Sequence, residues 1–231
     1  MTEMGDPGTR RDAGPGQPDA FDRHAARYDA WYDNPSGVAI LQEELDALRP
    51  LLAGLPLPWL EVGVGSGRFA SALGAEYGVD PATAALALAA SRGVRVAAAR
   101  AETLPFADAT FGAILFVTAL CFVPAPRSAL VEVRRVLVPG GRLLLGLILA
   151  DGPWGRRYRE LAQAGDPFYE RAHFFTRGEL TSLFTAVGFR LVRTRSALFG
   201  TPGAEAVAAP AREGYDPDAG FTVMALQASS H

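Results

Sequence analysis

The 231-residue chain contains one cysteine and no lysine, and it has no long uninterrupted apolar run. A single cysteine excludes an internal disulfide framework and a cysteine-rich metal site, so we expect no bound metal. The longest apolar segment, residues 143–150, has the length of a buried parallel strand and is far shorter than the roughly 20 residues that span a bilayer. The absence of lysine, beside heavy use of alanine, arginine and glycine, is typical of genomic composition bias and excludes no function.

The chain also lacks a strong charge of either sign and a secretion signal. Its formal net charge is −3 and no basic cluster is present, which argues against a nucleic-acid partner. The N-terminus has no apolar stretch preceding a cleavage site. We therefore expect a cytoplasmic protein with neither a membrane nor a nucleic acid as partner, and the sequence leaves the oligomeric state open.

The most informative segment is residues 60–69, with the sequence LEVGVGSGRF. It predicts a buried strand, a glycine-rich turn and the start of a helix. Gly63, Gly65 and Gly67 permit the positive φ of a sharp turn and leave room for a ligand to approach the backbone. The helix N-terminus presents free N–H groups to the same place. Such a loop is typical of proteins that bind a nucleotide or a nucleoside.

Two ligands are compatible with this loop. Counted from Gly65, the pattern Gly65-x-Gly67-x-x-Ala70 satisfies the loose dinucleotide fingerprint of NAD(P)-dependent oxidoreductases. Counted from Gly63, three alternating glycines follow an acid, Glu61, and this pattern resembles the first motif of the class I S-adenosylmethionine (SAM) methyltransferases. A carboxylate suits the ammonium and sulfonium groups of SAM, whereas it would repel a pyrophosphate.

Asp80 ends the second predicted strand, about 20 residues beyond the loop, where an acid can bind a ribose diol. Both NAD and SAM carry that diol, so Asp80 supports a nucleoside without choosing between them. An N-cap of the helix expected over residues 81–92 is a second interpretation of Asp80, and the two roles are compatible.

A second motif strengthens the methyltransferase resemblance. Residues 101–106, with the sequence AETLPF, are similar to a loop of the small-molecule branch of that family, which contains methyltransferase type 11-like domains. The resemblance implies that Ala101 and Glu102 lie beside the adenine. Arg100 departs from the pattern, because relatives usually have an acid at that position. The turn RVLVPGG at residues 135–141 also resembles the family.

The order of the predicted strands and helices along the chain indicates an α/β fold. Apolar strand segments alternate with helical segments of about 10–15 residues, which indicates right-handed parallel crossovers and a doubly wound sheet. The last strand follows no crossover helix and must therefore run antiparallel. The resemblance implies the same Rossmann-like sheet of seven strands, mostly parallel with the last one reversed. The expected strands are residues 59–62, 77–79, 94–98, 113–117, 142–149, 189–198 and 221–227.

We divide the chain into a tail and one domain. Residues 1–18 are rich in glycine, proline and charge and are expected to be disordered. Residues 19–231 form a single methyltransferase domain. Its expected parts are an N-terminal helical lid (19–56), a SAM-binding core (57–149), an acceptor-side insert (150–175) and a helix with the C-terminal strands (176–231).

Ligands of open α/β sheets bind beyond the carboxyl ends of the strands. SAM is therefore expected across the ends of the first three strands, with its methyl group toward the end of the fourth. The predicted cofactor-binding residues are Glu61, Gly63, Gly65, Gly67, Asp80, Ala101, Glu102 and Thr118. The acceptor is expected between the fourth strand, the insert and the N-terminal aromatic helix. The predicted pocket residues are Tyr28, Tyr32, Cys121 and Tyr169.

Methyl transfer from a sulfonium is an in-line displacement, for which positioning alone can supply ~7–11 kcal/mol. A general base is needed only for a protonated acceptor, and His173 is the candidate by residue type and place, although a structural histidine fits equally well. Cys121 fits best as a small pocket-wall side chain. Tyr28, Trp31 and Tyr32 form either a lid over SAM, an aromatic wall for a cationic amine, or a stripe that packs their helix on the domain.

The residues after the fourth strand argue against a nucleobase acceptor, because the Asn/Asp-Pro-Pro-aromatic run of base-methylating enzymes is replaced by TALC at residues 118–121. The sequence thus predicts a SAM-dependent methyltransferase that releases S-adenosylhomocysteine and methylates an O, N or S atom of a small molecule. The alternatives are an NAD(P)-dependent oxidoreductase and a SAM-binding protein without catalytic activity.

Overall fold

The structure is a computed structural model that describes residues 20–200, 202 and 209–229. The predicted tail, residues 1–18, lies outside the described residues. The strands are β1 (Trp59–Val62), β2 (Tyr77–Asp80), β3 (Arg95–Ala98), β4 (Phe111–Val117), β5 (Leu137–Leu147), β6 (Phe189–Ala197), β7 (Arg212–Glu213) and β8 (Phe221–Ala228). The helices are α1 (Ala20–Arg23), α2 (Ala25–Trp31), α3 (Pro35–Leu52), α4 (Arg68–Leu73), α5 (Thr83–Ser91), η1 (Leu120–Phe122), α6 (Pro126–Val136), α7 (Pro153–Gln163) and α8 (Arg177–Ala186).

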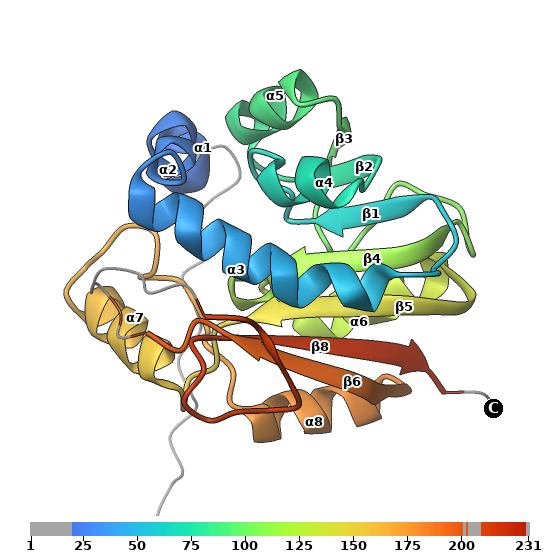
Figure 1. Cartoon of the computed structure of the whole chain (residues 1–231). Helices are drawn as coiled ribbons and strands as arrows, with labels where there is room; N and C mark the ends of the chain where they lie inside the picture. Colours follow the sequence, from blue (N-terminus) through green and yellow to red (C-terminus); the bar gives the residue numbers. More distant parts are fainter. Residues whose placement is uncertain (1–19, 201, 203–208, 230–231) are drawn as a thin grey trace, which may run out of the picture.

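The strands form one sheet in the order β3-β2-β1-β4-β5-β8-β6-β7 (Figure 1). β1 pairs in parallel with β2 and β4, while β2 pairs with β3 and β4 with β5 in the same sense. β8 lies between β5 and β6 and is antiparallel to both. The doubly wound sheet and its reversed last strand are therefore confirmed.

The number of strands differs from the expected seven, because the described residues contain eight. The additional strand, β7, falls in the segment before the last strand that the sequence predicts to be a loop. It pairs over two residues with β6, and Glu213 in it forms ion pairs with Arg193 and Arg195 of β6. Two residues are too few for a strand periodicity, so the sequence carries no signal for it.

Several element boundaries also differ from the predicted ones. The helix predicted over residues 81–92 begins at Thr83, because the Asp80 carboxylate accepts a hydrogen bond from Ala82 N and holds Pro81 in a turn. β5 begins at Leu137 opposite Phe111, and its register shifts before the next pair. α8 begins with a capping box, in which Thr176 accepts a hydrogen bond from Glu179 N and the Glu179 side chain accepts one from Thr176 N.

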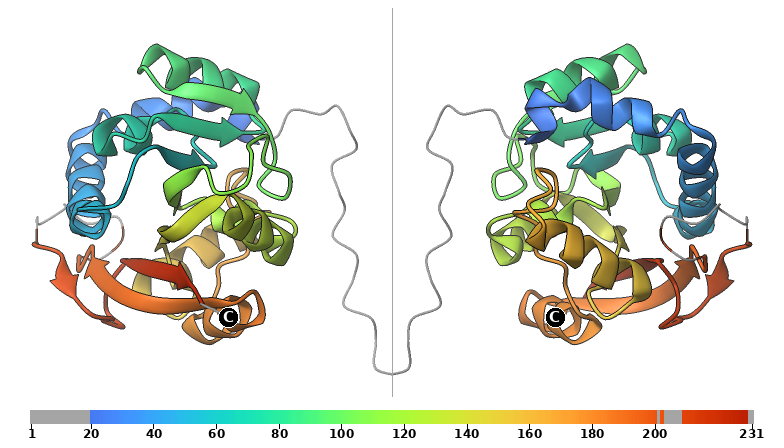
Figure 2. Two further views of the ribbon diagram at one scale, coloured as in Figure 1. Left: turned by 90° about the vertical axis from the view of Figure 1, so that its right-hand side faces the viewer. Right: turned by 90° about the vertical axis from the view of Figure 1, so that its left-hand side faces the viewer.

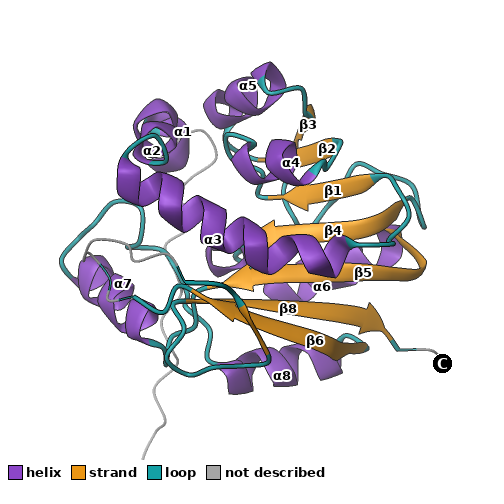
Figure 3. Cartoon of the chain, viewed as in Figure 1, coloured by secondary structure: helices purple, strands orange, loops and turns teal. Residues whose placement is uncertain are grey.

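Helices cover both faces of the sheet, so alternate strand residues enter two separate cores. Leu144 of β5 packs in the core that α3 and α4 help to form, whereas Leu143 and Leu145 pack in the core of α6 and α8. Figures 2 and 3 show α3 and α6 on opposite sides of the sheet. β4 is buried along its whole length, as expected of a central parallel strand.

The carboxyl ends of β1, β4 and β5 point toward one edge of the molecule, where α1, α2 and α7 gather (Figure 1). This edge is where open α/β sheets bind ligands. Every helix of the described residues is too short or too polar to span a bilayer.

Candidate functional site

The glycine-rich loop joins β1 to α4 and is tied to the end of β2. Gly63 N and Val64 N both donate to Val79 O, at 2.8 and 3.0 Å, and Gly67 N donates to Val64 O at 2.8 Å. Gly63, Gly65 and Gly67 have φ values of +73°, +50° and +79°. Side chains rarely tolerate this left-handed region, so the turn requires its glycines.

The three glycines serve different purposes. A Cβ atom at Gly63 would lie 2.4 Å from the Cβ of Ala119, and one at Gly67 would lie 2.8 Å from the Cα of Ala89. Those two positions are therefore glycine because the protein itself packs against them. A Cβ atom at Gly65 would meet nothing within 4 Å. The loop is thus open at Gly65, as expected of a cradle for a ligand.

Asp80 braces this cradle from the end of β2. Its Oδ2 accepts a hydrogen bond from Gly65 N at 2.9 Å, and its Oδ1 accepts one from Ala82 N at 2.8 Å. Asp80 is therefore not the N-cap residue of α5, a position that Ala82 occupies, although its carboxylate holds the approach to that helix. A contact of the Asp80 carboxylate with a ribose hydroxyl stays a prediction.

Glu61 is buried beneath the same loop, with 2% of its surface exposed. Burial raises the pKa of its carboxyl well above the usual range, a backbone hydrogen bond from Ala70 opposes this, and the charge of Asp80 raises the pKa further. Among the described residues Glu61 Oε2 has no hydrogen-bond partner. The charge of Asp80 would repel a diphosphate, whereas a cationic group beside Glu61 would favour the charged form of that carboxyl, which burial opposes. The residues present therefore fit SAM.

The predicted adenine-side residues lie on the loop after β3. Ala101 is buried. Glu102 Oε1 accepts a hydrogen bond from Ala125 N at 3.1 Å and its other oxygen lies 4.0 Å from Arg100 Nε. The Glu102 side chain thus holds the start of α6, and a contact of either residue with the adenine stays a prediction.

Thr118 follows the carboxyl end of β4 and has a φ of +50°. Its N–H donates to Gly146 O at 2.8 Å, which ties this strained residue to the end of β5. A left-handed conformation costs a threonine on the order of 1–3 kcal/mol, and such residues cluster at functional sites. Nothing in the local sequence indicates this conformation.

A cavity of about 320 Å³ opens beside Thr118, at the small end of the size range of small-molecule sites. The four predicted pocket residues, Tyr28, Tyr32, Cys121 and Tyr169, all line it. The lining comes from α2, α3, the ends of β4 and β5, α7 and the segment after α7, and includes many aromatic side chains. Their role toward an acceptor stays a proposal.

The sequence prediction missed Glu44, a cavity residue on α3. Glu44 is only 3% exposed and its Oε2 has no hydrogen-bond partner among the described residues. Burial raises the pKa of its carboxyl to about 8, and the neighbouring Glu43 adds to the shift. The sequence does contain a pattern that could have predicted this buried glutamate, because Ile40, Glu44 and Leu48 recur every four residues on the buried face of α3. A charged residue inside an apolar helix stripe indicates a buried polar site.

Cys121 and His173 differ in their position relative to the cavity: Cys121 lines it and His173 does not. Enclosure by protein raises the pKa of the Cys121 thiol to about 12, and its Sγ lies 3.4 Å from Thr118 O, which fits a wall residue. His173 is not among the side chains that line the cavity. Its Nε2 lies 3.4 Å from Glu179 Oε1 of α8. A general-base role for His173 stays a prediction, without support from this geometry.

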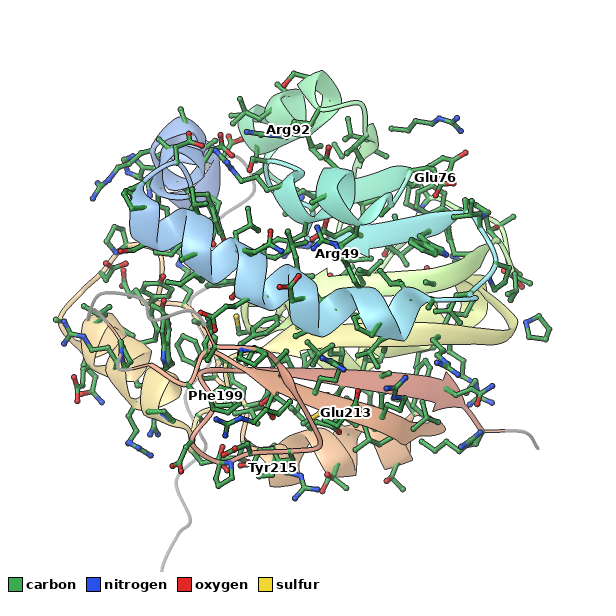
Figure 4. All side chains as sticks on the ribbon, viewed as in Figure 1. Arg49, Glu76, Arg92, Phe199, Glu213 and Tyr215 are labelled. Carbon is green, nitrogen blue, oxygen red and sulfur yellow. The ribbon has the colours of Figure 1, made fainter. Side chains whose placement is uncertain are left out.

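A buried ion-pair cluster fixes α2 against the glycine loop. Asp29 Oδ1 accepts from Arg68 Nε at 2.7 Å, and Asp29 Oδ2 accepts from Arg92 Nη2 at 2.8 Å. Arg92 also donates to Ser66 O inside the loop, at 2.7 Å, and lies between α5 and the α1–α2 pair in Figure 4. Burial would raise the pKa of Asp29, but hydrogen bonds with Arg68, Ser66 and Arg92 outweigh it and hold the pKa at about 2.

This cluster was also missed, because its partners stand 39 and 63 residues apart in the chain. Its position explains its importance. Asp29 lies on α2 between Tyr28 and Tyr32, whereas Arg68 and Ser66 belong to the glycine loop and its helix. The ion pairs therefore connect the aromatic wall of the cavity to the predicted cofactor loop.

Replacing Asp29 with asparagine is expected to lower the free energy of unfolding by about 2–3 kcal/mol at pH 7, because Arg68 and Arg92 lose a shielded partner. The pKa of Asp29 is lowered on folding from 3.8 to about 2. Its contribution is therefore present above pH 4 and is lost as the pH falls toward 2. Urea unfolding followed by tryptophan fluorescence measures both effects.

Asp46→Asn is the matched control, because Asp46 forms an exposed ion pair with Arg49 on α3. We expect this variant to lie within about 0.5 kcal/mol of the wild type. Equal losses in the two variants would contradict the role assigned to the Asp29 cluster.

Sequence comparisons place the chain among known proteins. Residues 60–145 match the family model of a methyltransferase domain. An uncharacterised protein of Mycobacterium tuberculosis is 43% identical over 213 residues, which are 92% of this chain and 75% of that protein. An uncharacterised protein of Methanocaldococcus jannaschii is 34% identical over 182 residues, covering 78% and 85% of the two chains.

Solved structures identify the enzyme class. A SAM-dependent methyltransferase of Thermotoga maritima, described as a possible histamine N-methyltransferase, is 34% identical with a TM-score of 0.80, covering 89% of this chain and 97% of that one. The N-methyltransferase NodS of Bradyrhizobium japonicum, solved with S-adenosyl-L-homocysteine, shares the fold at 18% identity with a TM-score of 0.63, covering 91% and 97%. These matches favour SAM over NAD(P) at the glycine loop. The chain belongs to the SAM-dependent methyltransferases.

Proposed function

We propose that the protein transfers the methyl group of SAM to an O, N or S atom of a small molecule bound in the cavity beside Thr118. One observation supports the choice of a small molecule, namely the cavity of about 320 Å³ at the end of β4. Its lining residue Thr118 is followed by Ala119, which packs against Gly63 of the glycine loop. Its aromatic lining and small size suit a compact organic acceptor.

The cofactor is proposed to lie across the carboxyl ends of β1, β2 and β3. Gly65 provides the open cradle, Glu61 provides a buried carboxyl oxygen for the ammonium group, and the Asp80 carboxylate faces the ribose diol. Ala101 and Glu102 are proposed to border the adenine. When bound, SAM supplies an electrophilic methyl group on a positively charged sulfur.

The protein's own residues then contribute alignment and exclusion of water. The aromatic wall separates the reacting atoms from solvent, and the Asp29 cluster holds that wall at a fixed position relative to the glycine loop. Alignment of this kind can lower the barrier by ~7–11 kcal/mol, which is enough for a reaction whose leaving group is already activated.

The direct test is incubation of the purified protein with SAM carrying a labelled methyl group and a panel of small amines, phenols and thiols. Histamine is included because the Thermotoga maritima relative is described as a possible histamine N-methyltransferase. We expect S-adenosylhomocysteine and one labelled product to form together. Failure of the protein to bind SAM or S-adenosylhomocysteine in calorimetry would contradict the proposal.

Replacing Asp80 with alanine is expected to weaken binding of S-adenosylhomocysteine by about 1–3 kcal/mol, because a charge-assisted hydrogen bond to the ribose is lost. Calorimetric titration measures the change. Asp108→Ala serves as the control, because Asp108 is an exposed partner of Arg135 and its loss is expected to leave affinity unchanged. An unchanged affinity in Asp80→Ala would place the ribose elsewhere.

A further inference from the structure

The cavity contains a buried carboxyl group that the reaction proposed above does not use. Glu44 enters it from α3, is 3% exposed, and has an Oε2 atom without a hydrogen-bond partner among the described residues. Arg27 is the one cationic side chain among the described lining residues, and it is exposed. No ion pair joins it to Glu44 among those residues. A buried carboxyl group without a partner is costly, so its presence in a ligand cavity calls for a ligand that compensates it.

The surroundings of Glu44 are aromatic. Its negative charge raises the pKa of Tyr28 and Tyr32 on α2 and of Tyr158 on α7, in each case adding to the effect of burial, so all three lie within its field. Tyr158 in turn stacks on Phe174 and contacts Tyr169 at a centroid distance of 4.6 Å. The faces of aromatic rings attract cations. A carboxyl group enclosed by such rings therefore forms a site for an ammonium group.

Other acceptor classes fit less well. An anionic acceptor would be repelled by Glu44 and would find no buried cation in the described lining. A neutral alcohol or thiol would not pair with the negative charge that Glu44 carries once it has lost its proton. The cavity volume of about 320 Å³ equals roughly ten water volumes, so the ligand is small.

We infer that the methyl acceptor is a small amine, and that Glu44 binds its ammonium group and takes up its proton. This inference rests on the proposed function of the same cavity. Burial keeps Glu44 protonated in the empty cavity, and binding of the ammonium group favours its charged form, so Glu44 releases that proton to solvent as the amine binds. A protonated amine has no lone pair, so one proton then passes from nitrogen to the Glu44 carboxylate before reaction. The nitrogen lone pair then forms the new N–C bond while the S–C bonding pair returns to sulfur, and the positive charge passes from sulfur to the methylated nitrogen. Glu44 finally loses its proton to solvent.

The test compares three probes of nearly equal shape on the wild-type protein saturated with S-adenosylhomocysteine. Phenethylamine, 2-phenylethanol and 3-phenylpropionate are titrated in a calorimeter at pH 7. A buried ammonium group forms both a charged hydrogen bond with the Glu44 carboxylate and cation–π contacts with the aromatic rings. We therefore expect the amine to bind at least about tenfold more tightly than the alcohol. The carboxylate should bind more weakly than either.

The variant Glu44→Gln keeps the shape of the side chain and removes its charge. We expect it to lose the preference for the amine over the alcohol while it binds S-adenosylhomocysteine as the wild type does. Glu43→Gln is the matched control on the same helix. Glu43 lines a separate shallow groove outside this cavity, so the amine preference should survive its replacement.

Equal binding of amine and alcohol by the wild type would overturn the inference, and so would an amine preference that survives in Glu44→Gln. The first of these results needs no variant and therefore does not depend on how well a variant folds. A wild type that binds S-adenosylhomocysteine and methylates only alcohols or thiols, as identified by mass spectrometry, would overturn the amine inference and leave the proposed function standing. Failure to bind S-adenosylhomocysteine would instead overturn the proposed function.

Discussion

Gly65→Val is expected to lower the affinity for S-adenosylhomocysteine by at least about a hundredfold, which corresponds to about 2.8 kcal/mol. The reason is geometric. Gly65 has a φ of +50° and a Cβ atom there would meet no protein atom within 4 Å, so the branched side chain would project into the space proposed for the cofactor. Calorimetric titration of the folded variant measures the loss, with circular dichroism to confirm its secondary structure.

Gly74→Val is the control that distinguishes a blocked cofactor site from the effect of backbone strain. Gly74 ends α4 with a φ of +83° and, like Gly65, has no atom within 4 Å of a Cβ placed on it. Both variants should therefore lose stability through backbone strain, whereas only the valine at position 65 should block the cofactor. Comparable affinity in the two variants would remove Gly65 from the binding site.

Glu44→Gln is expected to become more stable than the wild type as the pH rises from 5 to 9. Folding raises the pKa of Glu44 from 4.5 to about 8, chiefly through burial. Between these two values the folded protein keeps a proton that the unfolded chain releases, so the stability of the wild type falls as the pH rises. A pKa shift of this size corresponds to a loss of up to about 4–5 kcal/mol in the free energy of unfolding of the wild type. Glutamine does not titrate, so this loss is absent from the variant.

The tyrosines around Glu44 do not titrate between pH 5 and 9. Tyr28, Tyr32 and Tyr158 have pKa values raised to about 12 or further, because they are buried and face Glu44. Glu43 also has a raised pKa and is present in both proteins, and its effect on the Glu44 pKa is part of the shift that the comparison measures.

Urea unfolding curves at pH 5, 7 and 9 measure the stability difference between Glu44→Gln and the wild type. Glu160→Gln is the control, because Glu160 forms an exposed ion pair with Arg157 on α7 and its replacement should follow the wild type at every pH. A difference between Glu44→Gln and the wild type that stays constant from pH 5 to 9 would show that Glu44 is not buried as a neutral acid.

Much of the fold could be read from local patterns. β1 was predicted with its observed bounds, and the glycine turn, the buried run of β4 and the capping box at Thr176 each depend on residues close together in the chain. Strand periodicity, turn geometry and helix capping act over a few residues, so they appear directly in the sequence. The short strand β7 and the late start of α5 were missed because an ion pair and a side-chain hydrogen bond decide them.

The doubly wound sheet with its reversed last strand, the glycine turn and the segments after the fourth and fifth strands that border the cavity could be predicted from the sequence, because each follows from strand direction and local backbone conformation. Three contacts could not be predicted from the sequence: the ion pairs of Asp29 with Arg68 and Arg92, the packing of Ala119 against Gly63, and the entry of Glu44 into an aromatic cavity. These contacts connect elements far apart in the chain. They depend on how α2, α3 and α7 dock at the carboxyl edge of the sheet, and no periodicity within one element specifies that docking.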